Sequence, residues 1–304
     1  MRKLTLSISP EMEGRSVESI LRREMNMDKG FIVRLKYKSG AILLDGESAR
    51  TVDKVKSGQL LELDVSDREG KSNIIPVDFP LNTIYEDADC AVIDKIAGMK
   101  THGFEAKPIP SLASAFAHRW GEKAAFHPVT RLDKGTSGLM CIALSGYAHS
   151  LFIRQMHSED YHREYFLICS PPPKEKKGSI SLPIARESND SPKRVVSPEG
   201  APSLTEYEVI AEEASLALVK ARLHTGRTHQ IRVHFAAIGC PLVGDSLYGE
   251  GSKSISRSAL HSAFLSMKQP ITGERIILRS PLPKDMAALS PILAEAARKE
   301  LEKL

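Results

Sequence analysis

The chain has 304 residues, of which 41% are hydrophobic and 26% charged, and its formal net charge is +4. These values are typical of a soluble globular protein of one or two domains, and no apolar run approaches the roughly 20 residues that a membrane-spanning helix needs. The composition therefore excludes an integral membrane protein. The four cysteines lie far apart, which favours buried thiols in a reducing compartment, and we expect a cytoplasmic protein.

The positive charge lies at the N-terminus. Residues 1–60 hold 12 Lys/Arg against 8 Asp/Glu, while the rest of the chain is balanced. This surplus suits a module that binds a polyanion, although an ordinary solvated surface is also compatible with it.

Residues 1–66 predict one small unit. Apolar residues at helical spacing predict short helices within 14–26 and 31–38, and strands are expected over 41–44 and 60–65. The pattern of residues 14–65 resembles an S4 RNA-binding domain, with Gly40-Ala41-Ile42-Leu43-Leu44-Asp45-Gly46 and Val55-Lys56-Ser57-Gly58 carrying the resemblance. It implies that the second helix lies against RNA phosphates, with contacts from Lys29, Arg34, Lys36 and Lys38.

Residues 67–80 are expected to form a polar linker, and a second domain is expected over 81–304. Strands and helices interleave there without regular alternation, so we predict an α+β fold: a mixed, mainly antiparallel sheet with packed helices. The tail over 283–304 is expected to form one docked helix. Residues 186–203 are either a plain loop or a segment that folds over nucleic acid through Lys193 and Arg194. The predicted strands cover 90–95, 139–144, 163–169, 204–210 and 216–223, and the predicted helices cover 111–119, 146–158 and 229–238.

Residues 131–138 read Arg-Leu-Asp-Lys-Gly-Thr-Ser-Gly, between two apolar stretches. A carboxylate at such a junction between core and tight turn is held rigidly and is partly desolvated, which suits a nucleophile or a general base. The alternative is a turn aspartate that caps the backbone. Asp133 is therefore a candidate catalytic residue.

Residues 223–249 contain the second informative segment. Thr228 is expected to cap a helix whose first turn presents Gln230 and Arg232, an arrangement that could receive a phosphate or hold Asp133 ionised. A metal site built from His224, His229 and His234 is disfavoured, because spacings of five do not place imidazoles on one helix face.

Together these segments resemble the RluA-type family of RNA pseudouridine synthases. Three stretches in this order carry the resemblance: Tyr85-Glu86-Asp87 through Lys95 and Gly98; Arg131-Leu132-Asp133 with Thr136-Ser137-Gly138; and Thr225 to His234, followed by Gly244-Asp245 and Tyr248-Gly249. The chain departs from the family pattern at Thr130, where histidine is common, and at Ile96, where proline is usual.

The resemblance implies isomerisation of uridine in RNA, with no cofactor and no metal. Asp133 acts as nucleophile or base, and the two roles stay open. The nucleotide must be flipped out of its helix. By the resemblance Arg131 fills the vacated stack, Tyr165 packs on the uracil, and Arg232 pairs with the carboxylate.

Two other classes of protein compete with this interpretation. A magnesium phosphatase of the haloacid-dehalogenase type is imitated by Asp133 and Asp245, but glycines stand at 135 and 249, where further acids are expected. A non-catalytic ribosome assembly factor is the other alternative. For the partner we expect RNA, ribosomal RNA first and transfer RNA second, with no DNA and no membrane, bound by a monomer.

Overall fold

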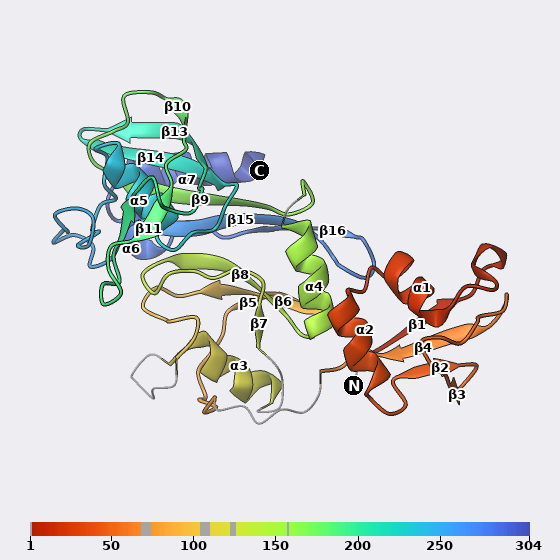
Figure 1. The fold of residues 1–304 in the computed structure, drawn as a ribbon. Coiled ribbons are helices and arrows are strands. Elements are labelled where there is room, and N and C mark those ends of the chain that lie inside the picture. The colour runs from red at the N-terminus through yellow and green to blue at the C-terminus, as the bar shows by residue number, and fades with distance from the viewer. Residues whose placement is uncertain (1, 68–73, 104–109, 122–125, 157) are drawn as a thin grey trace.

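The computed structural model describes residues 2–67, 74–103, 110–121, 126–156 and 158–304. Its N-terminal part is a small antiparallel sheet in the order β1-β4-β2-β3, with two helices beside it (Figure 1). Ser16 and Asp28 start these helices, since each side chain accepts a backbone N–H from the helix that follows. The elements are β1 (Lys3–Ser7), the 3-10 turn η1 (Pro10–Met12), α1 (Val17–Arg23), α2 (Lys29–Lys36), β2 (Ile42–Leu44), β3 (Glu47–Ser48) and β4 (Leu60–Asp64).

The N-terminal core extends onto helix α4 (Gly146–Gln155), which belongs to the later part of the chain. Tyr147 and Leu151, one turn apart, are buried in the same apolar cluster as α1 and α2. The Tyr147 ring lies 5.3 Å from the Phe31 ring, and its hydroxyl donates to the Met25 carbonyl at 2.6 Å. The N-terminal unit is therefore packed on α4.

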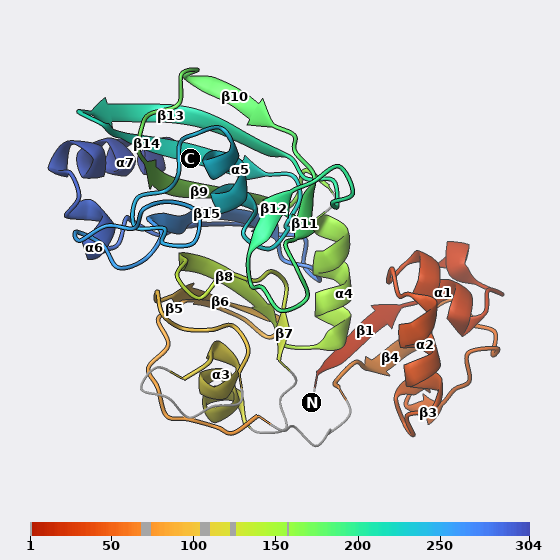
Figure 2. The same cartoon turned by 60° about the vertical axis from the view of Figure 1, so that its left-hand side comes forward.

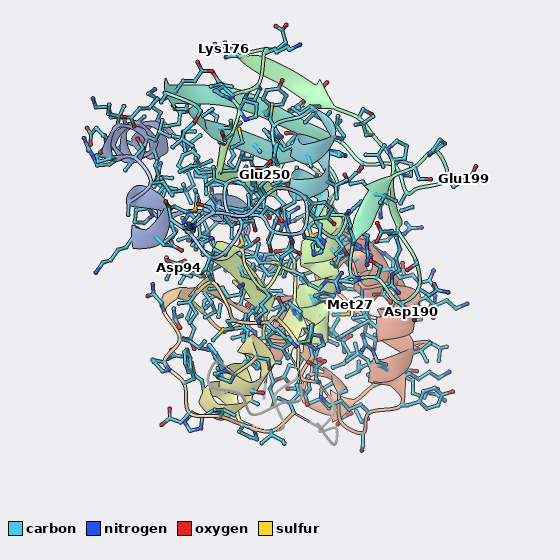
Figure 3. All side chains as sticks on the ribbon, turned by 90° about the vertical axis from the view of Figure 1, so that its left-hand side faces the viewer. Met27, Asp94, Lys176, Asp190, Glu199 and Glu250 are labelled. Carbon is cyan, nitrogen blue, oxygen red and sulfur yellow. The ribbon has the colours of Figure 1, made fainter. Side chains whose placement is uncertain are left out.

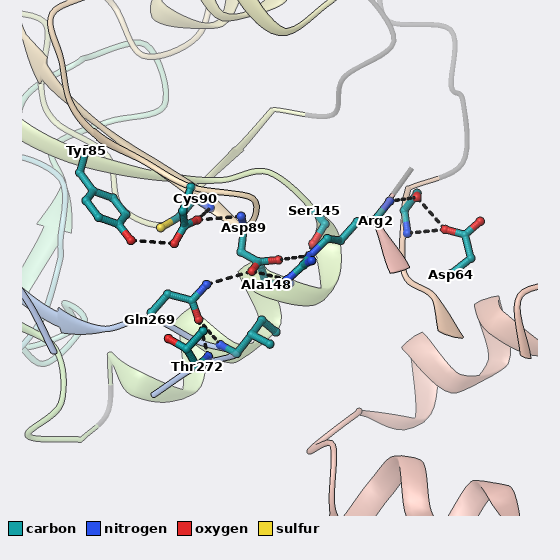
Figure 4. A network of polar contacts seen from close by, with 12 residues as sticks. Arg2, Asp64, Tyr85, Asp89, Cys90, Ser145, Ala148, Gln269 and Thr272 are labelled. Atoms are coloured by element: carbon teal, nitrogen blue, oxygen red, sulfur yellow. Dashed lines mark hydrogen bonds and ion pairs between the residues drawn. The ribbon is translucent and has the colours of Figure 1, made fainter. Parts of the chain in front are cut away.

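A polar cluster fixes the same two parts together (Figure 4). The buried carboxylate of Asp89 accepts two hydrogen bonds from the Arg2 guanidinium, at 2.7 and 2.8 Å, and one from Gln269 at 2.9 Å. Asp67 forms a second link, because its carboxylate binds His127 at 2.8 Å and the backbone N–H of Gly146 at 3.1 Å.

The main sheet has ten strands in the order β10-β13-β14-β9-β15-β8-β6-β5, with β16 on β15 and β7 on β8. Every pair is antiparallel except β15 with β8, so the predicted mixed, mainly antiparallel fold is confirmed. The strands are β5 (Thr83–Glu86), β6 (Cys90–Lys95), β7 (His127–Pro128), β8 (Ser137–Ala143), β9 (His162–Cys169), β10 (Lys177–Ile180), β13 (Thr205–Glu213), β14 (Leu216–Leu223), β15 (Leu260–Lys268) and β16 (Arg275–Arg279).

Helices cover both faces of this sheet (Figure 2). Apolar residues of α3 (Leu112–Trp120) and α5 (Gln230–Ala237) share one core cluster with β6, β8, β9 and β14. Helices α6 (Lys284–Ala287) and α7 (Pro291–Lys303) pack on the opposite face. In the described parts of the chain, no helix has the length and apolar character needed to cross a bilayer.

Two expectations need correction. The tail contains two helices, because Ser290 caps α7 and Pro291 occupies its first turn, where a missing N–H does no harm. Residues 186–203 include part of a two-stranded sheet of β11 (Ile184–Arg186) and β12 (Arg194–Val196). Figure 3 labels Asp190 and Glu199, in the loops before and after β12, and shows Glu199 at the edge of the molecule.

Candidate active site

Asp133 lies in the loop between β7 and β8, and the backbone of this loop is fixed from several directions. Four successive carbonyls accept a hydrogen bond, two of them from side chains of distant segments. A loop held in this way cannot shift the backbone of Asp133 without breaking several bonds. The carbonyls of Leu132, Asp133, Lys134 and Gly135 receive Thr101 Oγ1 at 3.1 Å, Thr136 N at 3.1 Å, Gly98 N at 2.7 Å and Arg257 Nη1 at 3.1 Å, respectively.

The end of the motif sets how β8 approaches β15. Gly138 has a φ of +109°, and a Cβ built on it would lie 2.2 Å from the carbonyl oxygen of Ser262, so only glycine fits. The preceding Ser137 Oγ pairs with Nδ1 of buried His261 at 2.9 Å. Burial lowers the pKa of His261 to about 4, so this imidazole is neutral at neutral pH.

The Asp133 side chain is 25% exposed and faces two basic groups of the third motif. Arg232 Nη1 lies 3.6 Å from Asp133 Oδ2, and His229 Nε2 lies 3.9 Å from the same oxygen. Burial lowers the pKa of His229, although the charge of Asp133 opposes this effect. Arg232 is therefore the permanent cation beside Asp133.

Arg232 is itself held by Asp245, which is buried. Its Nε and Nη2 donate to the two carboxylate oxygens of Asp245 at 2.6 and 2.8 Å, and its guanidinium lies 5.0 Å from the Tyr248 ring centre. Burial alone would lower the pKa of Arg232, but the hydrogen bonds and charge of Asp245, with that of Asp133, raise it. The phosphatase interpretation assigned Asp245 to a metal motif. This assignment is wrong, because both carboxylate oxygens of Asp245 bind Arg232.

The start of α5 differs from the expected one. The helix begins at Gln230, and the capping position belongs to His229, which is left-handed with a φ of 59° and makes no side-chain cap, so the prediction for Thr228 is wrong. Gln230 is buried and its amide binds Thr205 and Leu204, so it does not present a donor to an anion. His229 Nδ1 instead pairs with the Tyr248 hydroxyl at 2.9 Å.

A pocket joins the predicted site residues. Tyr165, buried on β9, lines it together with Asp133 and Arg232. Arg131 stands at its exposed side. The remaining wall combines apolar residues, among them Leu223, Ile231 and Leu260, with the polar residues Thr136, Arg163, Arg227, His229 and Gln230. Residues that lie far apart in the sequence thus surround one carboxylate.

The pocket opens into a groove of about 710 Å³ that also contains Asp133 and Arg131. Its charged lining is seven cations and one carboxylate, which is the electrostatic character of a polyanion-binding surface. Helix α4 contributes His149 and Ile153, and its C-cap residue Met156 also lines the groove. Sequence reasoning identified Arg131 and Arg194 but missed the other five cations, since single basic residues scattered along a chain carry no signal. The cations are Lys100, Arg131, Lys134, Arg163, Arg186, Arg194 and Arg227.

The remaining predicted RNA contacts lie outside this groove. Lys29, Arg34 and Lys36 are exposed on α2. The Lys38 ammonium is bound by Asp64 at 2.9 Å and by the Ser66 carbonyl at 2.8 Å. Lys193 lies 3.8 Å from Glu187.

Lys95 lies fully buried close to the Asp133 loop. Its ammonium donates to the carbonyls of Ile96 and Met99 at 3.0 Å each, in the turn whose Gly98 N–H binds the loop. Burial lowers the pKa of Lys95 to about 7, against the opposing charge of Asp133. Lys95 therefore stabilises the turn that is hydrogen-bonded to the Asp133 loop.

Comparison with known proteins places this geometry in a family. Residues 89–237 match the family model described as RNA pseudouridylate synthase. The "Uncharacterized RNA pseudouridine synthase YhcT" of Bacillus subtilis is 36% identical over 293 residues, which cover 95% of this chain and 96% of that protein. The "Ribosomal large subunit pseudouridine synthase D" of Xanthomonas campestris is 35% identical over 282 residues, which cover 87% of this chain and 85% of that protein.

Among solved structures, "Human RNA Pseudouridylate Synthase Domain Containing 1" superposes with a TM-score of 0.56 at 25% identity, over 74% of this chain and 90% of that one. The chain belongs to the RNA pseudouridine synthases. It is therefore an isomerase that acts on RNA.

Proposed function

We propose that Asp133 is the catalytic residue of this RNA pseudouridine synthase. The observation that carries the proposal is the single pocket in which Asp133 lies 3.6 Å from Arg232 and shares a wall with buried Tyr165. Asp133 attacks the flipped uridine as nucleophile or removes a proton as base, the C–N glycosidic bond breaks, and C5 of the turned uracil then bonds to the ribose. C5 gives up its proton to solvent when it bonds to the ribose, and N1 takes up a proton, so the composition of the nucleoside is unchanged and no oxidant or reductant is needed.

The surrounding residues take separate parts in this scheme. Arg232 keeps the carboxylate ionised and oriented, since a nearby cation favours the charged form. Tyr165 supplies an aromatic face for the uracil, in a wall that also contains the apolar residues Leu223 and Leu260. Arg131, exposed where pocket and groove meet, fills the space that the flipped base leaves in the RNA stack.

RNA binding uses two surfaces in this proposal. The seven cations of the groove, which include Arg194 from β12, hold the phosphates next to the target. The N-terminal unit over 1–66 acts as an S4-like RNA-binding domain through Lys29, Arg34 and Lys36 on α2, followed by a linker over 67–80 and the catalytic domain over 81–304. Lys38 and Lys193, which have acidic neighbours, contribute less.

The proposed substrate is large-subunit ribosomal RNA. Support comes from the 35% identity with the Xanthomonas campestris enzyme, whose name assigns it to the ribosomal large subunit. Transfer RNA is the second candidate from the sequence, and no feature of the described structure favours it.

Pseudouridine mapping tests the assignment of both residue and substrate. Total RNA is taken from a strain that lacks the gene and from the same strain carrying the wild-type gene, Asp133→Asn or Lys299→Ala. Lys299 is an exposed residue of α7 and serves as the control. We expect ribosomal sites that disappear in the deletion strain and return with the wild type and Lys299→Ala but not with Asp133→Asn. Return with Asp133→Asn defeats the catalytic assignment, and sites confined to transfer RNA defeat the substrate assignment.

A further inference from the structure

Thr136 carries a buried hydroxyl that nothing in the described structure satisfies. Its Oγ1 is enclosed and has no hydrogen-bond partner among the described residues, and the residue is 2% exposed. The polar groups beside it are paired, since Ser137 Oγ binds His261, the Gly135 carbonyl binds Arg257, and the Thr136 N–H binds the Asp133 carbonyl. Native proteins pair nearly all buried polar groups, so an exception next to an active site calls for an explanation in function.

The position of Thr136 narrows the explanation. It lines the pocket that contains Asp133 and Tyr165 but not the basic groove outside it. Three of the groove cations, Arg131, Arg163 and Arg227, also line the pocket, but Thr136 borders the pocket alone. A nucleoside that enters the pocket therefore lies beside Thr136. Leu223 and Leu260 on its wall offer no side-chain partner to the carbonyls and imide N–H of a uracil ring, whereas Thr136 and the basic side chains of Arg163, Arg227 and His229 can meet these atoms.

We propose that Thr136 is a binding residue for the target base, and that its hydroxyl exchanges a hydrogen bond with a polar atom of the flipped uracil. A hydroxyl can donate to a uracil carbonyl or accept from the imide N–H. The inference rests on the proposed function, because it places a uridine in the pocket of Asp133. The unpaired Thr136 hydroxyl destabilises the free protein, and the bound uracil supplies the missing hydrogen bond.

Thr136→Val tests this directly, because valine has the same shape without the hydroxyl. RNA from the deletion strain, grown on 5-tritiated uridine, serves as substrate, and tritium release at limiting RNA gives kcat/KM. We expect kcat/KM to fall about two- to tenfold, as for one neutral hydrogen bond. The Tm should rise by about 2–4 °C, since an unsatisfied polar group has been removed. Thr136→Ser, which keeps the hydroxyl, should be more active than Thr136→Val.

Thr83→Val is the matched control. Thr83 Oγ1 on β5 is also buried and has no hydrogen-bond partner within the described ranges, but Thr83 lines neither the pocket nor the groove. This variant should show the rise in Tm and unchanged tritium release. The proposal is overturned if Thr136→Val keeps full activity, if its Tm falls together with its activity, or if the serine variant is no better than the valine variant.

Two further comparisons show which part of the nucleotide Thr136 contacts, and distinguish a failure of this inference from a failure of the proposed function. A stem-loop oligonucleotide with the mapped target as uridine or 2′-deoxyuridine is titrated against wild type and Thr136→Val. Equal weakening of both ligands supports a contact to uracil, whereas weakening of the uridine ligand alone assigns the hydroxyl to the ribose 2′-OH and overturns the proposal. If Asp133→Asn releases tritium like the wild type, the proposed function fails; if only Thr136→Val does, this inference alone fails.

Discussion

Arg232 is bound more closely to Asp245 than to Asp133. Both Asp245 oxygens lie within 2.8 Å of Arg232 nitrogens, whereas Asp133 lies 3.6 Å from Nη1. The arginine is thus fixed by a buried carboxylate and offers its remaining nitrogen to Asp133. This arrangement orients a cation at the site, while Asp133 keeps freedom to react.

Asp245→Asn tests whether Arg232 must be held by a carboxylate for Asp133 to react. The variant leaves Arg232 buried beside a neutral amide, and breaking a buried ion pair costs about 3–5 kcal/mol of unfolding free energy. We expect that loss in urea unfolding, together with tritium release at least about tenfold lower, equivalent to 1.4 kcal/mol in the barrier. Arg298→Ala, which removes the exposed ion pairs with Glu295 and Glu302 on α7, should change stability by less than about 1 kcal/mol. Near-normal turnover by Asp245→Asn would show that Arg232 needs no such support.

Two lysines of the N-terminal unit should behave differently toward RNA. Lys36 is exposed, whereas Lys38 is bound by Asp64, and that interaction helps to keep the pKa of Asp64 below its usual value despite partial burial. Lys36→Ala should weaken RNA binding and reduce the slope of log K against log salt by about 1. Lys38→Ala should leave the slope close to that of the wild type and lower the Tm. Binding isotherms at several salt concentrations measure both, and equal slope changes would contradict the assignment.

Arg2→Ala should loosen the N-terminal unit without touching the Asp133 loop. The change leaves the buried Asp89 carboxylate with Gln269 alone as its side-chain partner, which costs about 1–3 kcal/mol. We expect a lower urea midpoint and faster proteolysis within residues 2–66, with tritium release from labelled RNA retained. Arg23→Ala, at an exposed position of α1, is the control. Unchanged proteolysis would mean that the apolar contact through Tyr147 holds the unit by itself.

Lys95 should give stability a specific dependence on pH. Its pKa is about 7 in the folded protein against 10.5 in the unfolded chain, so between these values the unfolded state binds more protons. The unfolding free energy then rises with pH by up to about 1.4 kcal/mol per unit. From pH 7 to 9 the stability of the wild type relative to Lys95→Met should therefore increase by at least about 1 kcal/mol, with little change below pH 7. Urea unfolding at each pH measures the difference, and a constant difference contradicts the shift.

Local patterns predicted the elements that carry the motifs, and tertiary contacts decided the rest. Asp133 and Arg232 lie in short segments whose residue order is itself informative. The pairing of Arg232 with Asp245, thirteen residues later, depends on the turn at Gly244, where a Cβ would lie 2.2 Å from the Arg257 carbonyl oxygen.

The order of strands in the main sheet could not be predicted from local patterns either. β15 joins β9 to β8 in the centre of the sheet, yet it was not predicted, because it is buried on both faces and lacks the alternation of a half-exposed strand. The docking of Tyr147 into the N-terminal core had no sequence signal either, since a helix with two apolar faces resembles any buried helix.

The most direct test of the role of Asp133 is tritium release from RNA labelled with 5-tritiated uridine, measured for the wild type and for Asp133→Asn. An equal Tm of the two proteins shows that the variant is folded. We expect release by the wild type and none above background by the variant, whose amide can neither attack the nucleoside nor accept a proton from it. Release by Asp133→Asn at the wild-type rate would contradict the account.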